Sequence, residues 1–164
     1  LTHNNISRKL STRLPYIRAK LTQKRHFMAT SEVVYKGELS TVAVHLKSGS
    51  QLMTDAPTDN NGLGRTFSPT DLLATALASC MLTIMGIRAK ESQLDISDSK
   101  ATVTKIMTSG PRRVSEVVVE LEITDRGLSD LHRKILEKAA TTCPVALSLS
   151  ETLKQTVSFS YRKI

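Results

Sequence analysis

Between residues 31 and 55 the chain alternates apolar and polar positions, most clearly from Val42 to Leu46. A period of two is typical of half-buried β-strands. The pairs Lys36-Gly37 and Ser48-Gly49 have the composition of turns. The pattern predicts a meander of two or three strands. A loop is expected over residues 55–67, which are rich in Pro, Asp, Asn and Gly and show neither the strand nor the helix period.

Residues 72–85 carry no charge and would be apolar on every side of a helix. Ser68 is a suitable N-cap for this helix, Pro69 fits its first position, and Asp71 complements the helix dipole in the first turn. Charged residues return only at Arg88 and beyond, which gives a helix of about 20 residues. A small domain cannot cover such a helix alone, so we expect a sheet to wrap it or a second copy of the chain to pack against it.

The rest of the chain continues with strand-like and helix-like patterns. The predicted elements are strands over 100–107 and 113–124, a helix capped by Ser129 and running to about Thr141, a short helix from Pro144 to about Leu153, and a last strand over 155–161. The order βββ-α-ββ-αα-β predicts a single α+β domain over residues 28–164.

Positive charge is concentrated in the first 27 residues. The net charge is +8, but seven Lys and Arg residues and no Asp or Glu precede Met28, so residues 28–164 have a net charge of +1. This part of the chain has little electrostatic attraction for phosphate groups. It is also poor in aromatic side chains that could stack on bases, so nucleic-acid binding is not expected.

Residues 1–27 lack the continuous apolar stretch of a secretory signal peptide. Their basic, Ser- and Thr-containing composition is that of an organellar transit peptide, whereas Met28 to Ser31 reads like an ordinary protein start. We expect an extended gene start or a disordered tail, with targeting or a functional basic arm as the alternatives. The chain has no run of about 18 apolar residues, so no membrane span is expected.

Cys80 and Cys143 are the only cysteines, too few for a disulfide-stapled scaffold, and no spacing suggests a zinc site. We expect no metal or cofactor. This cysteine usage fits a reducing cytoplasm, where a reactive pair is catalytic or sensing. Cys80, on an Ala-rich helix, also fits a buried structural residue. Cys143 precedes Pro144 at a predicted helix start, where the dipole lowers thiol pKa. Spacing alone leaves open whether the two cysteines meet.

Several motifs resemble the OsmC/Ohr family of thiol peroxidases over about residues 31–161: Ser68 to Leu73, the Ala-rich run ending at Cys80, Cys143-Pro144-Val145, and Phe159-Ser160-Tyr161. The resemblance implies an OsmC-like fold, in which a long buried central helix is wrapped by antiparallel sheets in an intertwined homodimer. The active sites of such a dimer lie at the subunit interface.

The resemblance also implies a reaction. The residue matching Cys80 reduces a peroxide, either an organic hydroperoxide or hydrogen peroxide, and becomes a sulfenic acid, and the residue matching Cys143 resolves it as a disulfide. A lipoyl- or thioredoxin-like dithiol then reduces the pair. The alternatives are a redox-sensing or small-molecule-binding protein of the same fold without efficient turnover, and a structural dimer with inert thiols.

The chain departs from the best-studied branch of that family, which pairs the reactive cysteine with a Glu directly after the helix-start Pro and with an Arg from an early strand turn. Thr70 takes the Glu position, Asp71 lies about 100° further round the helix, and residues 37–40 contain no Arg. A less-characterised branch has a His followed by Ser-Gly, which His45 matches, so His45 is a candidate to polarise the thiol or protonate the leaving group. Arg65 is the candidate replacement for the Arg. A surface histidine and a solvated loop cation are the respective alternatives.

Overall fold

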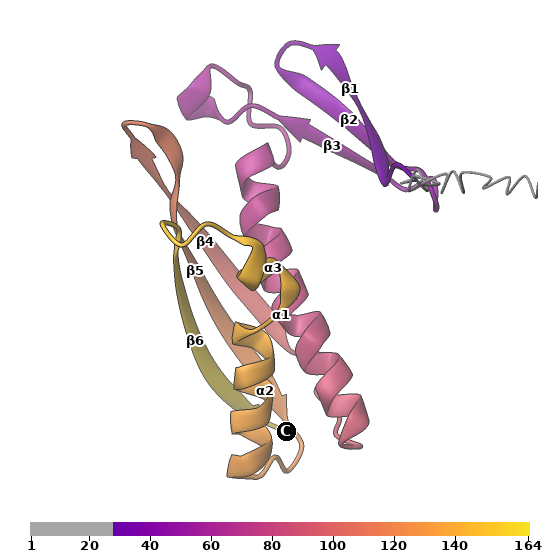
Figure 1. The fold of residues 1–164 in the computed structure, drawn as a ribbon, viewed down its shortest axis with the longest axis vertical. Coiled ribbons are helices and arrows are strands. Elements are labelled where there is room, and N and C mark those ends of the chain that lie inside the picture. The colour runs from indigo at the N-terminus through magenta and orange to yellow at the C-terminus, as the bar shows by residue number, and fades with distance from the viewer. Residues whose placement is uncertain (1–27) are drawn as a thin grey trace, which may run out of the picture.

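A computed structural model of the chain describes residues 28–164, and the predicted basic tail of residues 1–27 lies outside the described residues. The elements are β1 (Ser31–Gly37), β2 (Ser40–His45), β3 (Gln51–Asp55), the 3-10 turn η1 (Thr58–Asn60), α1 (Pro69–Glu91), β4 (Lys100–Ser109), β5 (Arg112–Asp125), α2 (Asp130–Thr141), α3 (Pro144–Ser148) and β6 (Lys154–Lys163) (Figure 1). The predicted α+β order is confirmed.

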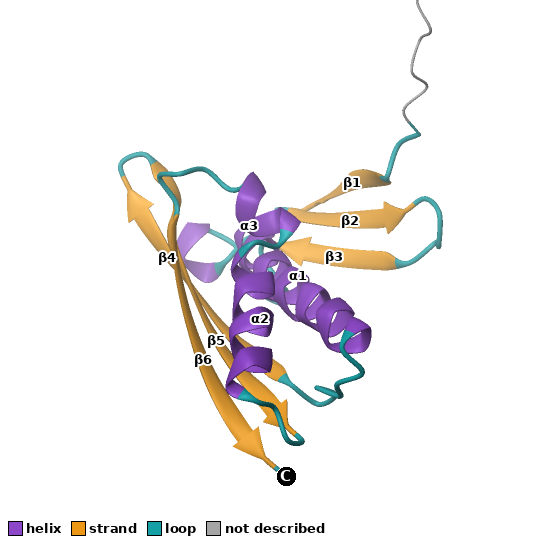
Figure 2. Cartoon of the chain, turned by 60° about the horizontal axis from the view of Figure 1, so that its bottom comes forward, coloured by secondary structure: helices purple, strands orange, loops and turns teal. Residues whose placement is uncertain are grey.

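The first sheet, β1-β2-β3, is an antiparallel meander that lies apart from the other elements (Figures 1 and 2). Large apolar side chains stay exposed on it: Val33 is 61%, Tyr35 64% and Met53 59% accessible. Isolated apolar residues on a surface are ordinary, but several on one small sheet indicate a surface that another element covers.

The second sheet has the order β4-β5-β6, with β4 and β5 antiparallel and β5 and β6 parallel. The expectation of antiparallel sheets is therefore wrong for the last strand pair. The reason lies in the connection: α2 and α3 form a crossover between β5 and β6, and a crossover through helices returns the chain to run in the same direction. The short helix predicted from Pro144 to about Leu153 ends earlier, at Ser148, because Leu149 takes an extended conformation.

Helix α1 begins as its sequence predicts. The side chain of Ser68 accepts the backbone N–H of Asp71, and the Asp71 carboxylate accepts the N–H of Ser68, forming a capping box with Pro69 in the first turn. The helix packs on the inner face of the second sheet beside α2 (Figure 2). The buried core consists mainly of Leu77, Met81 and Met85 of α1, Val117, Val119, Leu121 and Ile123 of β5, and Leu136 of α2.

By length and composition α1 is apolar enough to cross a membrane, although 33% of its apolar window is buried within the chain. The central helix of a globular domain passes the same test, and the packing of α1 against the second sheet and α2 is that of a core helix.

Helix α2 is held to β6 by Tyr161, whose hydroxyl donates to Glu137 at 2.8 Å and whose ring centre lies 4.7 Å from the Arg133 guanidinium carbon.

Candidate active site

Cys80 lies in the middle of α1 and is half-buried against the core. Cys80 lies between the side of α1 that packs against the core and the side that faces outward. The four-residue steps from Cys80 lead to Ile84 and then to Arg88, on the side of α1 that faces α2. Cys80 is half-buried and Cys143 is fully buried, so Cys80 is the more accessible of the two cysteines.

Cys143 is the N-cap residue of α3 and is fully buried. Its sulfur accepts the backbone N–H of Ala146 at 3.4 Å. Burial raises the pKa of the Cys143 thiol, and the hydrogen bond from Ala146 only partly opposes this increase. The expectation of a lowered pKa at this helix start is therefore wrong, because α3 has only five residues and the desolvation of the thiolate outweighs its N-terminal N–H groups.

The fold makes the two cysteines neighbours, which their spacing in sequence left open. Helix α3 packs on α1, and the Cys80 side chain raises the pKa of Cys143 further through a hydrogen bond and through its charge. Both thiols are free. The crossover between β5 and β6 thus delivers Cys143 to the one cysteine of α1.

Arg65 lies in the loop before α1 and is bound to the first sheet. Its Nε donates to Asp55 Oδ2 at 2.9 Å, its backbone N–H donates to the same oxygen, and Nη2 donates to Ser40 Oγ. These hydrogen bonds lower the pKa of Asp55, whose side chain is 1% exposed, while that of Arg65 is 52% exposed. Within one chain Arg65 holds the loop to β2 and β3.

Asp71 caps α1 and forms an ion pair with Lys105 of β4. Lys105 Nζ lies 2.7 Å from Asp71 Oδ1 and donates to Ser68 Oγ and Thr70 Oγ1 at 3.0 and 2.8 Å. Partial burial raises the pKa of Asp71, but the hydrogen bonds from Lys105 and Ser68 together outweigh it, so the pKa lies below its usual range. The carboxylate is ionised at neutral pH.

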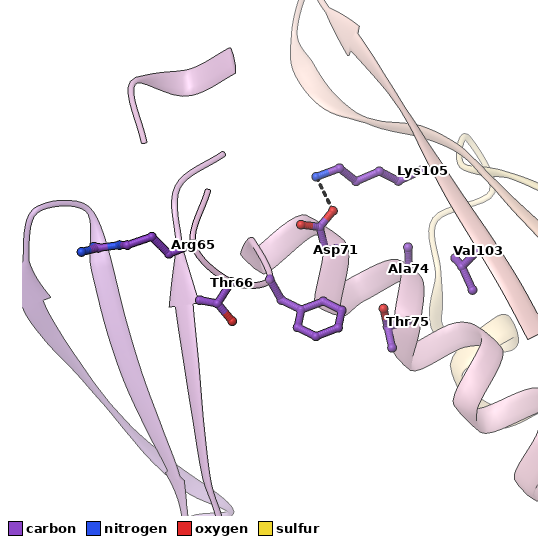
Figure 3. A pocket seen from close by; sticks show the side chains of 8 residues that line it. Arg65, Thr66, Asp71, Ala74, Thr75, Val103 and Lys105 are labelled. Atoms are coloured by element: carbon purple, nitrogen blue, oxygen red, sulfur yellow. Dashed lines mark ion pairs between the residues drawn. The ribbon is translucent and has the colours of Figure 1, made fainter. Parts of the chain in front are cut away.

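These charged groups line a pocket of about 560 Å³ between β4, the start of α1 and the preceding loop (Figure 3). Arg65, Asp71 and Lys105 lie at its edge, with Phe67 and Val103 as apolar wall residues. Cys80 is nine residues beyond Asp71, about 13 Å along the helix axis. Within one chain the charged pocket lies at the start of α1, where its lining extends to Thr75, whereas Cys80 lies in the middle of α1 and Cys143 at the start of α3.

Sequence reasoning missed Lys105. The signal was present in the strand period, because Lys105 has the phase of the inward-facing Ala101 and Val103, where an apolar residue is expected. A lysine at such a position is retained where a carboxylate and hydroxyl oxygens receive its three N–H donors.

His45 ends β2 at the edge of the first sheet remote from α1, since the opposite end of β2, at Ser40, pairs with Asp55 beside the loop to α1. Its Nδ1 lies 2.7 Å from Ser48 Oγ, and the side chain is exposed. Within one chain the fold does not bring His45 to Cys80. Among residues 28–164, no three His, Cys, Asp or Glu side chains gather as metal ligands.

The family model described as OsmC-like protein matches residues 61–158, which is more than half of the chain. The chain belongs to the OsmC-like protein family. A structure of a putative osmotic stress induced and detoxification response protein from Psychrobacter arcticus 273-4 is 50% identical and has a TM-score of 0.78, covering 81% of this chain and 96% of that chain. The resemblance expected from the sequence motifs is thereby confirmed.

More distant structures share the fold of this OsmC-like protein. The OsmC like protein from Mycoplasma pneumoniae is 19% identical with a TM-score of 0.68, covering 83% of this chain and 98% of that chain. An organic hydroperoxide resistance protein OsmC from Legionella pneumophila is 18% identical with a TM-score of 0.62, covering 82% and 98%. No curated protein sequence is significantly similar to this chain.

Proposed function

We propose that this OsmC-like protein is a thiol peroxidase that reduces organic hydroperoxides through Cys80 and Cys143. The observation that carries the proposal is the adjacency of two free thiols, one half-buried on α1 and one fully buried at the start of α3. The 50% identity to a detoxification response protein and the likeness of the fold to hydroperoxide resistance proteins support a role in peroxide removal.

The proposed reaction starts at Cys80, because a substrate reaches a half-buried sulfur more readily than a fully buried one. The Cys80 thiolate attacks the distal oxygen of the hydroperoxide, the O–O bond breaks, and the alkoxide leaves as an alcohol after taking a proton. Cys80 becomes a sulfenic acid. Two electrons have passed from sulfur to the peroxide.

Cys143 then resolves the sulfenic acid. The Cys143 thiol loses its proton as its sulfur attacks the Cys80 sulfur, the S–O bond breaks, and the leaving hydroxide takes a proton and departs as water. The raised pKa of Cys143 keeps it a thiol at neutral pH, which suits a group that must wait for the oxidised partner. A lipoyl- or thioredoxin-like dithiol is the proposed reductant, and the reducing cytoplasm is the compartment that keeps such a pair in use.

Homodimerisation is part of the proposal. One face of α1 presents small or modest side chains to the outside, at spacings of three and four residues. This small-residue face consists of Leu72, Ala76, Ser79, Thr83 and Gly86, all exposed or half-buried in the single chain. A second α1 packed here, with a partner covering the apolar residues of the first sheet, would bury surfaces that one chain leaves open.

The proposed activating groups of Cys80 are Asp71, Arg65 and His45, and each has other contacts within one chain. Within one chain Asp71 forms an ion pair with Lys105, and Arg65 forms one with Asp55. His45 lies at the edge of the first sheet that is remote from α1. A dimer is the arrangement in which any of these three side chains could approach the Cys80 of the other chain. Their catalytic roles therefore depend on the proposed dimer.

The test uses the reduced protein and cumene hydroperoxide. Stoichiometric peroxide should consume both thiols, form a Cys80–Cys143 disulfide detected by peptide mass spectrometry, and support turnover with dithiothreitol. Cys80→Ser should abolish peroxide consumption, and Cys143→Ser should allow one oxidation that a sulfenic-acid probe traps. The reverse pattern would exchange the two roles. Oxidation without turnover would favour a redox sensor, and unreacted thiols would refute the proposal.

A further inference from the structure

Helices α1 and α2 run side by side (Figures 1 and 2). A second pocket, of about 480 Å³, lies between them. We call it the basic groove. Its apolar wall is formed by Ile84, Ile135 and Pro144, and its cations are Arg88, Lys134 and Lys138. Among residues 28–164, no carboxylate lines it. The basic groove thus combines an apolar surface with one sign of charge.

The basic groove adjoins the two thiols. Thr142 and Pro144, which line it, are the chain neighbours of Cys143. Ile84, on the other wall, lies one turn of α1 beyond Cys80, and Arg88 one turn further. Neither cysteine lines the basic groove, but a molecule seated in it would lie about one helical turn from Cys80, the more accessible of the two cysteines.

The two lysines of α2 that line the basic groove, Lys134 and Lys138, form no ion pair within the described residues 28–164. Residues 1–27 contain no acid. The nearest acids along α2 are already engaged, Asp130 by Arg133 and Glu137 by the Tyr161 hydroxyl. Arg88 shares its charge with Glu91.

Apolar area adds to the charge. Ile135 is 40% exposed, and Leu131, one turn earlier on the same side of α2, is 65% exposed. Exposed aliphatic side chains beside unpaired lysines are typical of a protein interface, in which an apolar centre is bordered by charges.

We propose that the basic groove docks the acidic face of the dithiol protein that reduces the Cys80–Cys143 disulfide. This inference rests on the proposed function. The chain's own basic tail is a poor occupant, because its seven Lys and Arg residues would be repelled. A second copy is also disfavoured, because it would bring the same cations, and the small-residue face lies on a different side of α1.

The electron transfer balances with a dithiol as the co-reactant. One partner thiolate attacks the more accessible Cys80 sulfur, the intramolecular disulfide breaks, and Cys143 leaves as a thiolate that takes a proton. The second partner thiolate attacks the mixed disulfide and releases Cys80. The partner ends as a disulfide, and both cysteines of this chain are reduced.

The test compares two synthetic dithiol peptides, one with Asp and Glu flanking its cysteines and one with Asn and Gln. The protein is oxidised with diamide, so its peroxidase activity is not needed to form the disulfide. We expect the acidic peptide to reduce the protein about tenfold faster than the neutral one at low salt, and the advantage to disappear at high salt. Dithiothreitol serves as the uncharged small reductant.

Reversing the charge of the two groove lysines tests whether the rate advantage of the acidic peptide arises at the basic groove. Lys134→Glu with Lys138→Glu should remove the advantage of the acidic peptide and leave reduction by dithiothreitol unchanged. Lys47→Glu with Lys163→Glu, which changes the net charge equally at exposed sites elsewhere, should keep it. Equal rates for both peptides, or an equal loss in both double variants, would overturn the docking proposal while leaving the peroxidase proposal standing.

Two further results would also overturn the docking proposal. If diamide forms no Cys80–Cys143 disulfide, there is no bond for a docked reductant to break. If the peptides show no charge preference but sedimentation with phosphatidylglycerol vesicles depends on Lys134 and Lys138, the basic groove binds a lipid surface instead. Failure with cumene hydroperoxide alone would refute only the peroxidase function.

Discussion

Lys105 shows how a single buried charge is kept in this fold. Its ammonium group meets the Asp71 carboxylate and two hydroxyl oxygens at the start of α1, so all three N–H donors have acceptors. The ion pair ties β4 to the first turn of α1. With side chains 20% and 37% exposed, the pair is partly screened by solvent, and its contribution to stability is modest.

Asp71→Asn should lower the free energy of unfolding at pH 7 by roughly 0.5–1 kcal/mol. The amide oxygen of Asn can still accept the Ser68 backbone N–H in the capping box, so the loss reports the charge. Because the pKa of Asp71 is lowered in the fold, its contribution is present above the unfolded-state pKa and disappears as pH falls through the folded pKa. The difference between the two proteins in urea denaturation should therefore vanish in strong acid. Glu151→Gln, at an exposed position, is the control. A pH-independent difference would contradict this account.

The two cysteines could be predicted from the sequence, whereas the contacts of the charged site residues could not, and the reason is physical. Cys80 and Cys143 are singled out by residue type and motif, whereas the partners of Asp71 and Arg65 depend on strands that are distant in sequence. The pKa of Cys143 was misjudged because a helix start is visible in sequence and the burial of its sulfur is not.

At the scale of the element, α1 is specified locally and β6 is not. Ser68, Pro69 and Asp71 fix the start of α1 within four consecutive residues, so its boundary was predictable. The strand pattern of residues 155–161 identifies a strand, but its parallel pairing with β5 depends on how α2 and α3 cross the sheet. Alternation reveals a strand's faces and says nothing about its neighbour.

Ser68→Ala should destabilise the protein by about 1–2 kcal/mol, because the hydroxyl is buried, caps α1 and accepts from Lys105. Urea denaturation at fixed protein concentration measures the change. Ser68→Thr, which keeps the hydroxyl, should lose less. Ser129→Ala at the start of α2 removes a more exposed cap and should cost about 1 kcal/mol or less. An unchanged Ser68→Ala protein would show that the cap contributes nothing.

At the scale of the whole molecule, residues 28–164 of one chain leave apolar surface exposed. The first sheet lies apart from the core (Figure 2). The residues of the small-residue face of α1 are exposed or half-buried. The apolar helix predicted a second copy from burial alone, and the fold adds which face of α1 is left for it.

Light scattering after size-exclusion chromatography should give twice the chain mass of 18.0 kDa. Thr83→Lys places a charge on the small-residue face and should weaken association about 100-fold or more, yielding monomer at micromolar concentration. Thr102→Lys, at an exposed position of β4, should leave the mass unchanged. A wild-type monomer would remove the dimer from the proposal.

The crossover that carries Cys143 between the parallel strands has a consequence for the oxidised protein. A bond from Cys80 to Cys143 would close a covalent loop containing the second half of α1 and all of β4, β5 and α2. Closing a loop of this length restricts the unfolded chain and stabilises the native state by about 4 kcal/mol. Each catalytic cycle would thus pass through the disulfide-bonded form, which resists heat and proteolysis better than the reduced form. The protein would therefore be most resistant to unfolding while peroxide is present.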